Sequence, residues 1–414
     1  MRISRLAIVA LFVVNMNAFA DQNKLQVTHS EPRTQGTSLA VDSTIFDESR
    51  IIDIYVPEGY EHSHRRYPVI YVMDSDYLFD MTVAIAKNRW SRDLAPQSII
   101  VGLAARNNHE RFDYAMPMLR DDGGVSFADS KPQIMSAFLN SELIPYIDGN
   151  YRTNGYQVLI GMSPTSTNVI YDYLSASPVF DAHIAIAADL QMKSLKGEPL
   201  NLAIAEQGKK RKDGFIVASR AATDLQNDPS REAFFQYLIN FPNADELGIY
   251  GYLPVETEHY SVALSTIDFA FEKLFPLAQW RPNYRALRNA EKPVTYLKAF
   301  YEDLSTKVGF QTYPTVDGYW MGNSILGLSR ALGRNDKLPQ AIEVLKWAEE
   351  QLPNNTWINH YLSRVYARMN NVELALHFAQ KTVKLGTEQQ DVNLAIFVEN
   401  RDALLALATS NKGD

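Results

Sequence analysis

The chain has 414 residues, of which 46% are hydrophobic and 21% are charged, and its formal net charge is −8 at pH 7. This length exceeds what one ordinary hydrophobic core supports and predicts two folded domains. Acidic residues outnumber basic ones and are dispersed, which argues against nucleic acid or an anionic membrane surface as a partner. The sequence has no cysteine, so we expect stability to come from packing without disulfides.

The first 20 residues have the composition of a secretory signal peptide. Arg2 and Arg5 precede an apolar run from residue 6 to 14, and Ala18-Phe19-Ala20 fits a small-x-small cleavage site. A membrane anchor would need roughly 20 apolar residues, and this run is much shorter. We therefore expect a mature protein that begins near Asp21, has no membrane span and resides in the periplasm or outside the cell.

Between about residues 40 and 275, short apolar runs alternate with amphipathic helical stretches. The predicted strands are 51–60, 67–76, 98–105, 157–161, 182–189, 214–219 and 247–254. Unbroken β-branched runs interleaved with helices indicate a mainly parallel sheet covered on both faces. The predicted fold class is α/β, and ligands of such sheets bind at the carboxyl ends of the strands. We assign residues 21–280 to this α/β domain.

Residues 281–414 form the second predicted domain, which is helical in pattern after the proline-bearing linker 276–293. Within it, Leu328–Leu332 recurs as Leu362–Tyr366 and Ala341 recurs as Ala375, both at a spacing of 34. This is the period of tetratricopeptide helix pairs, although the signature Trp and Gly are missing. Flanking helices near 291–308 and 388–408 would complete the stack. The resemblance implies a surface for a protein partner or for self-association.

A candidate nucleophile lies in the segment Leu159–Ser166. Ser163 follows a predicted strand and precedes a predicted helix, and Gly161 permits the tight turn that exposes such a serine. In α/β-hydrolases the chain order is serine, acid, histidine. His259 follows the last predicted strand and precedes the last helix of the α/β domain, so it is the candidate base.

The acid of this order should follow the strand 214–219, where Asp224 and Asp228 are the candidates. Asp228 precedes Pro229 and a helix, which favours an N-cap role, so Asp224 is preferred. Glu256 and Glu258 flank His259 and are the remaining alternatives. Of the other histidines, His183 is expected in the core and His109 in a polar loop.

Four segments resemble the putative-esterase family of α/β-hydrolases: residues 67–79, 105–117 and 256–275, together with the run from Phe138 to Ser163. That family includes siderophore (enterobactin-type) esterases, feruloyl esterases and S-formylglutathione hydrolase. The resemblance covers roughly residues 40 to 275 and implies a carboxylic ester hydrolase with Ser163 as nucleophile and His259 as base. It implies a small-molecule ester substrate but leaves its identity open.

The sequence departs from the family at the residue after the nucleophile. The family usually has Gly-His-Ser-x-Gly-Gly, and residues 161–166 here are Gly-Met-Ser-Pro-Thr-Ser. Pro164 has no N–H for the oxyanion hole, where one donor is worth about 10² to 10³ in rate. Three interpretations follow. Pro164 only stiffens the turn, or the Thr165 N–H or hydroxyl replaces the missing donor, beside a second donor near Asp76 or Tyr77. In the third, the site has lost catalysis and only binds a ligand.

The loop from Arg106 to Asp113 follows a predicted strand end. Arg106 is a candidate contact for an anionic or catecholate group, with a structural Arg–Asp brace as the alternative. The sequence has no metal-ligand spacing or glycine-rich phosphate loop, so no cofactor and no metal are expected. An exported serine esterase is the leading hypothesis, and a catalytically degenerate binding or scaffold protein is the alternative.

Overall fold

The computed structural model describes residues 35–107, 109–211, 213–316 and 324–410. The described residues from Gly36 onward belong to one compact unit. The predicted signal peptide lies outside the described residues. Within the described residues, no helix has both the length and the apolar character needed to cross a membrane.

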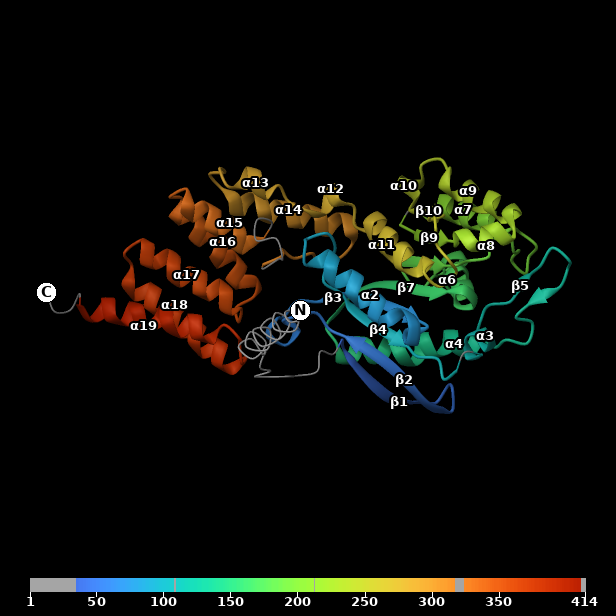
Figure 1. The fold of residues 1–414 in the computed structure, drawn as a ribbon, viewed down its shortest axis with the longest axis horizontal. Coiled ribbons are helices and arrows are strands. Elements are labelled where there is room, and N and C mark those ends of the chain that lie inside the picture. Colours follow the sequence, from blue (N-terminus) through green and yellow to red (C-terminus); the bar gives the residue numbers. More distant parts are fainter. Residues whose placement is uncertain (1–34, 108, 212, 317–323, 411–414) are drawn as a thin grey trace, which may run out of the picture. The chain divides into compact units, whose positions relative to one another are not determined.

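The predicted α/β class is confirmed by an eight-stranded sheet with the strand order β1-β2-β4-β3-β7-β8-β9-β10 (Figure 1). Six neighbouring strands, from β4 to β10 in this order, pair in parallel, whereas β1 and β2 pair antiparallel at one edge. The strands are β1 Thr37–Ser43, β2 Glu48–Tyr55, β3 Tyr67–Met73, β4 Ile99–Leu103, β7 Thr153–Met162, β8 Ala182–Ile186, β9 Phe215–Ser219 and β10 Ile249–Tyr252. A separate hairpin pairs β5 Met118–Leu119 with β6 Val125–Ser126.

All seven predicted strands are present. Strands β3, β4, β8 and β9 are buried throughout, whereas β2 alternates between buried and exposed residues. Alternate side chains of the same strand enter different cores: Tyr71 packs on one face of the sheet and Val72 on the other. Strand β1 was not predicted. Most of its side chains are at least partly exposed, so it lacks the continuous apolar run of the buried strands.

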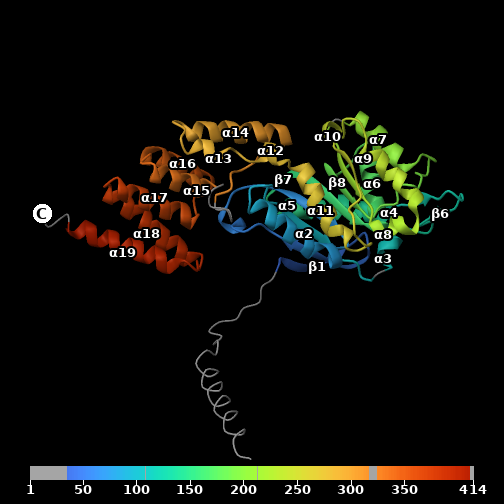
Figure 2. The same ribbon diagram turned by 45° about the horizontal axis from the view of Figure 1, so that its top comes forward.

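Helices cover both faces of the sheet (Figures 1 and 2). Helices α2 and α11 pack on one face, and α5, α6, α7 and α9 pack on the other. The bounds are α2 Ser75–Trp90, α3 Glu110–Asp113, α4 Pro132–Phe138, α5 Ile144–Asn150, α6 Ser166–Leu174, α7 Leu200–Lys210, α8 Ala222–Asn227, α9 Glu232–Ile239, α10 Ala244–Leu247 and α11 Val262–Leu274. Short 3₁₀ turns are η1 Tyr60–His62, η3 Ser163–Thr165 and η4 Pro229–Arg231, and a π-helical turn, η2 Leu139–Leu143, joins α4 to α5.

After α11 the described chain is all helical, as predicted. The helices are α12 Leu277–Trp280, α13 Tyr284–Leu287, α14 Pro293–Val308, α15 Ile325–Arg334, α16 Leu338–Gln351, α17 Thr356–Arg368, α18 Val372–Glu388 and α19 Leu394–Ser410. They share a core of their own that also includes Phe275 from the end of α11. The repeated segments lie at corresponding places: Leu328 and Leu362 on α15 and α17, and Ala341 and Ala375 on α16 and α18, all buried.

A cavity at the amino end of the sheet lies away from the predicted catalytic residues. It has a volume of about 460 Å³ and is lined by the start of β3 and by helical-region residues, including Arg65, Tyr67, Trp280 and Tyr313. Tyr67 begins β3, so this cavity is at the amino end of the strand. Neither Ser163 nor His259 lines it.

Candidate active site

Ser163 occupies a sharp turn between β7 and the helix that follows it. Its φ is 57°, in the left-handed region that residues other than glycine seldom adopt. Gly161 makes the turn feasible, because a Cβ at this position would lie 2.8 Å from the Thr165 carbonyl oxygen. A strained serine between a strand and a helix has the geometry of a nucleophile elbow.

Pro164 is buried in the first turn after Ser163, within η3. Its ring suits this position, because an N–H in the first helical turn has no acceptor within the helix. The missing N–H is therefore no defect for folding. It is a deficit only for chemistry that places negative charge beside Ser163.

Asp74 anchors the elbow from the neighbouring strand β3. Its Oδ2 accepts hydrogen bonds from the Met162 N–H, at 3.3 Å, and from the Thr165 hydroxyl. The same hydroxyl accepts from the Met162 N–H at 2.8 Å. On its other side, Asp74 Oδ1 lies 3.1 Å from Arg111 Nε. Burial raises the pKa of Asp74, although Arg111 and the Thr165 hydroxyl both favour its carboxylate form.

Sequence reasoning did not identify Asp74 as part of the site. Its partners Arg111 and Thr165 are 37 and 91 residues away along the chain. Because the Thr165 hydroxyl donates to Asp74, it is not free to donate to an oxyanion. The prediction that this hydroxyl replaces the missing oxyanion donor is therefore corrected. Of the two groups of Thr165, only its N–H stays a candidate donor to the oxyanion.

The predicted oxyanion donor at Tyr77 is also corrected. The Tyr77 N–H donates to the Asp74 carbonyl at 2.9 Å, within the first turn of α2. The N–H groups of Ser75 and Asp76 come before it in this turn, and the first N–H groups of a helix have no intrahelical acceptor. Asp76, which was named beside Tyr77 in the prediction, is therefore the better candidate for a main-chain donor.

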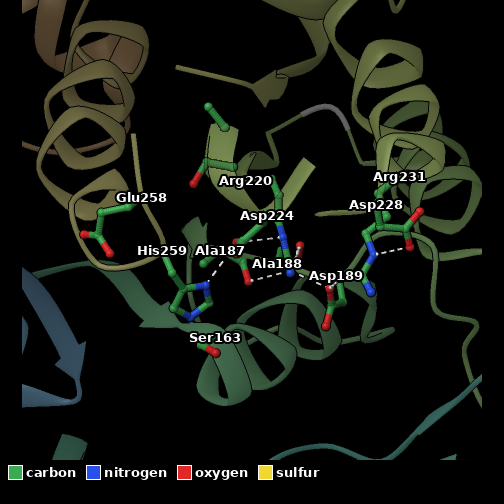
Figure 3. A network of polar contacts seen from close by, with 12 residues as sticks. Ser163, Ala187, Ala188, Asp189, Arg220, Asp224, Asp228, Arg231, Glu258 and His259 are labelled. Carbon is green, nitrogen blue, oxygen red and sulfur yellow. Dashed lines mark hydrogen bonds and ion pairs between the residues drawn. The ribbon is translucent and has the colours of Figure 1, made fainter. Parts of the chain in front are cut away.

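The structure brings His259 and Asp224 together. His259 Nδ1 lies 3.0 Å from Asp224 Oδ2. In Figure 3 the imidazole lies between Asp224 and Ser163, with its second ring nitrogen on the side of Ser163. The loop that carries His259 is tied to α8, because the Thr257 carbonyl accepts from the Thr223 N–H at 3.1 Å.

Two of the alternative acids, Asp228 and Glu258, have other partners. Asp228 Oδ2 lies 2.8 Å from Arg231 Nε, and Asp228 Oδ1 accepts from the Ser230 hydroxyl at 2.6 Å. Figure 3 shows this pair to one side of Asp224 and His259. The Glu258 carboxylate accepts from the Ser261 N–H of its own loop. The geometry therefore favours Asp224 as the partner of His259.

Arg106 is corrected from a candidate substrate contact to a structural brace. Its guanidinium binds the carboxylate of Glu48 and lies 2.9 Å from that of Glu110. The buried Glu110 also binds Arg50, which pairs with Glu48 at 2.9 Å. The two carboxylates thus balance the charges of Arg50 and Arg106 together, and no excess charge is left for a ligand.

The remaining predicted residues are outside the site. His183 is fully buried between Asp172, at 2.8 Å, and the Phe215 carbonyl, at 3.1 Å, so it belongs to the core as expected. His109 is exposed at the start of α3. No cluster of three or more metal-ligating side chains occurs among the described residues.

The family model described as putative esterase matches residues 43–210. The chain resembles the putative esterases. The matched segment contains Ser163 and Asp74 and ends before Asp224 and His259. No curated protein matches the sequence.

Two solved structures share the fold of this putative-esterase-like chain. An uncharacterised protein from Capnocytophaga ochracea is 16% identical, with a TM-score of 0.53, and the match covers 90% of this chain and 100% of that one. An IroE-like serine hydrolase from Shewanella oneidensis is 19% identical, with a TM-score of 0.54, over 84% of this chain and 99% of that one. Matches of this extent continue from the sheet into the helical region.

Proposed function

We propose that this protein is an exported serine hydrolase that cleaves a carboxylic ester through an acyl-enzyme intermediate. The observation that carries the proposal is the strained Ser163, with its φ of 57°, beside the hydrogen-bonded pair of His259 and Asp224 (Figure 3). The match of residues 43–210 to the putative esterases supports the same reaction.

In the proposed reaction, Ser163 Oγ attacks the ester carbonyl while His259 Nε2 takes its proton. The hydrogen bond from Nδ1 to Asp224 holds the tautomer that leaves Nε2 free and stabilises the imidazolium that forms. The imidazolium then gives its proton to the departing alcohol, which leaves an ester on Ser163. Water, deprotonated by His259, hydrolyses that ester and regenerates the serine.

The tetrahedral oxyanion would be stabilised by main-chain N–H groups near Ser163. We assign the N–H of Asp76 in the first turn of α2 as one donor, since this turn follows the strand that packs beside the elbow. The N–H of Thr165 is the second candidate. Because neither N–H comes from the residue directly after the nucleophile, this pair of donors is expected to stabilise the oxyanion less than the usual pair does.

The wider context of the reaction is proposed from the sequence. The predicted signal peptide supports a periplasmic or secreted enzyme, and the family resemblance supports a siderophore-like or small acyl ester as substrate. The helix pairs α15–α16 and α17–α18, with their buried alanines at a spacing of 34, support a tetratricopeptide-like region. Such a region would bind a protein partner or a second copy of the chain.

The first test is to purify the protein from Asp21 onward and to assay it with short-chain p-nitrophenyl esters and a fluorophosphonate probe. We expect ester turnover and covalent labelling that peptide mapping assigns to Ser163. Failure of both turnover and labelling would contradict the proposal and favour a binding or scaffold protein. Labelling without turnover would retain the nucleophile and direct the search to other esters.

Replacing Pro164 with alanine tests whether the proline limits catalysis. Alanine restores an N–H after the nucleophile and still suits the first helical turn, so we expect kcat to rise by about 10²-fold, the lower end of the contribution of one oxyanion donor. The matched control is Pro229→Ala, which also removes a proline from the first turn of a 3₁₀ helix but lies beside the Asp228–Arg231 pair. A Pro164→Ala variant with unchanged or lower kcat would show that other donors already complete the oxyanion hole.

A further inference from the structure

Arg220 is a buried cation that contacts the acid of the proposed triad. It directly follows β9 and is 7% exposed. Its Nε lies 3.0 Å from Asp224 Oδ2, the same oxygen that lies 3.0 Å from His259 Nδ1. One carboxylate oxygen therefore faces the imidazole and the guanidinium together, as Figure 3 shows.

The other end of the guanidinium is fixed by the segment that follows β8. Arg220 Nη1 donates to the Ala188 carbonyl at 2.9 Å and to the Ala187 carbonyl at 3.3 Å, and it binds the Asp189 carboxylate. The main chain is held as well, because the Arg220 N–H donates to the Tyr252 carbonyl at the end of β10, at 3.2 Å. Arg220 thus joins the carboxyl ends of three adjacent strands.

Asp224 itself lies on α8, a six-residue helix with no buried residue. A short helix of this kind offers little packing to hold a carboxylate in place. The contacts of Nη1 fix the guanidinium, which thereby holds a positive charge 3.0 Å from Asp224 Oδ2, as an ion pair in which the Nε–H makes no aligned hydrogen bond.

We infer that Arg220 is a positioning residue, which holds the Asp224 carboxylate in the orientation that aligns His259 with Ser163. This inference rests on the proposed esterase function and deepens it. Asp189 is the second carboxylate that pairs with Arg220. Asp189 also lies 3.3 Å from Arg231, which pairs in turn with Asp228. The alternating charges end at His259, the group that moves the proton.

The test compares Arg220→Met, Arg220→Lys and the matched control Arg231→Met, assayed with p-nitrophenyl esters. Arg231 shares Asp189 with Arg220 but pairs with Asp228 instead of Asp224. We expect Arg220→Met to lower kcat by about 10- to 100-fold with little change in KM, because a misplaced catalytic group costs rate. Arg220→Lys should keep part of this rate, since lysine retains the charge without the planar fork. Arg231→Met should stay within about twofold of the parent, because Arg231 is partly exposed, contacts neither Asp224 nor His259, and exposed ion pairs contribute little.

A double-mutant cycle separates positioning from general damage to the fold. If Arg220 acts through Asp224, then Arg220→Met should change kcat less than about twofold in an Asp224→Asn background. A loss by the same factor in both backgrounds would overturn the inference, and so would an unchanged kcat for Arg220→Met alone.

Proton NMR supplies a readout that needs no turnover. A proton in a His–Asp hydrogen bond resonates far downfield, so the His259 Nδ1–H signal should be present in the parent protein and in Arg231→Met. It should be lost in Arg220→Met and in Asp224→Asn. If the parent turns over no ester, this loss still supports the positioning role while the proposed function fails. A signal that persists in Arg220→Met overturns the positioning role alone.

Discussion

Replacing Ser163 with alanine is expected to lower kcat for p-nitrophenyl esters by on the order of 10⁵- to 10⁶-fold, the loss found when a serine hydrolase loses its nucleophile. The reason is that Ser163, in its strained turn beside His259, supplies the attacking hydroxyl of the proposed reaction (Figure 3). Steady-state kinetics over a range of enzyme concentrations measures the loss, and labelling by a fluorophosphonate should disappear with it.

Ser166→Ala is the matched control for Ser163→Ala. Ser166 lies in the same turn, and its hydroxyl donates to the Ser163 carbonyl at 2.6 Å instead of reaching the imidazole. We expect this variant to keep its labelling and to lose less than about tenfold in kcat, as for the loss of one supporting contact. Activity that survives in Ser163→Ala would rule out this serine as the nucleophile.

Asp224→Asn is expected to lower kcat by about 10⁴-fold while KM changes little. An asparagine fills the same space, but its amide no longer fixes the tautomer in which Nδ1 carries the proton, and it cannot stabilise the imidazolium. It also leaves the buried Arg220 with only Asp189 as a carboxylate partner. The rate of Ser163 labelling should fall in parallel.

Asp228→Asn provides the comparison that distinguishes the two candidate acids. Its carboxylate pairs with Arg231 near the surface, so its loss should change kcat by less than about threefold, since exposed ion pairs contribute little. If Asp228→Asn proved as damaging as Asp224→Asn, the acid would have to be reassigned.

The sequence predicts the sheet well because parallel strands buried on both faces need continuous apolar runs, and these are local signals. The same logic predicts Ser163 and His259 as site residues, since their positions relative to strand ends can be read from the sequence. The sequence does not predict strand β1, because its side chains are mostly exposed and the strand pairs only with β2 at the edge of the sheet.

The errors concern groups whose partners are distant in the sequence. For Arg106, the sequence does not show the pairing with Glu48, which lies 58 residues away on β2 and which, together with the nearby Glu110, occupies the guanidinium. The Tyr77 N–H was proposed as a donor because the start of α2 at Ser75 could not be fixed from the sequence. Asp74 and Arg220 went unnoticed for the same reason: each acquires its role only when neighbouring strands bring separated loops together.

The spacing of the three proposed catalytic groups has a consequence for how this protein acquires activity. Ser163 follows β7, Asp224 follows β9 and His259 follows β10, and β8 separates the first of these strands from the others. The constellation therefore exists only after four adjacent strands have docked in register, and such non-local pairing forms slowly. Recovery of esterase activity during refolding would then be a late event, and it would report the completed assembly of this half of the sheet more faithfully than the earlier recovery of helix signal.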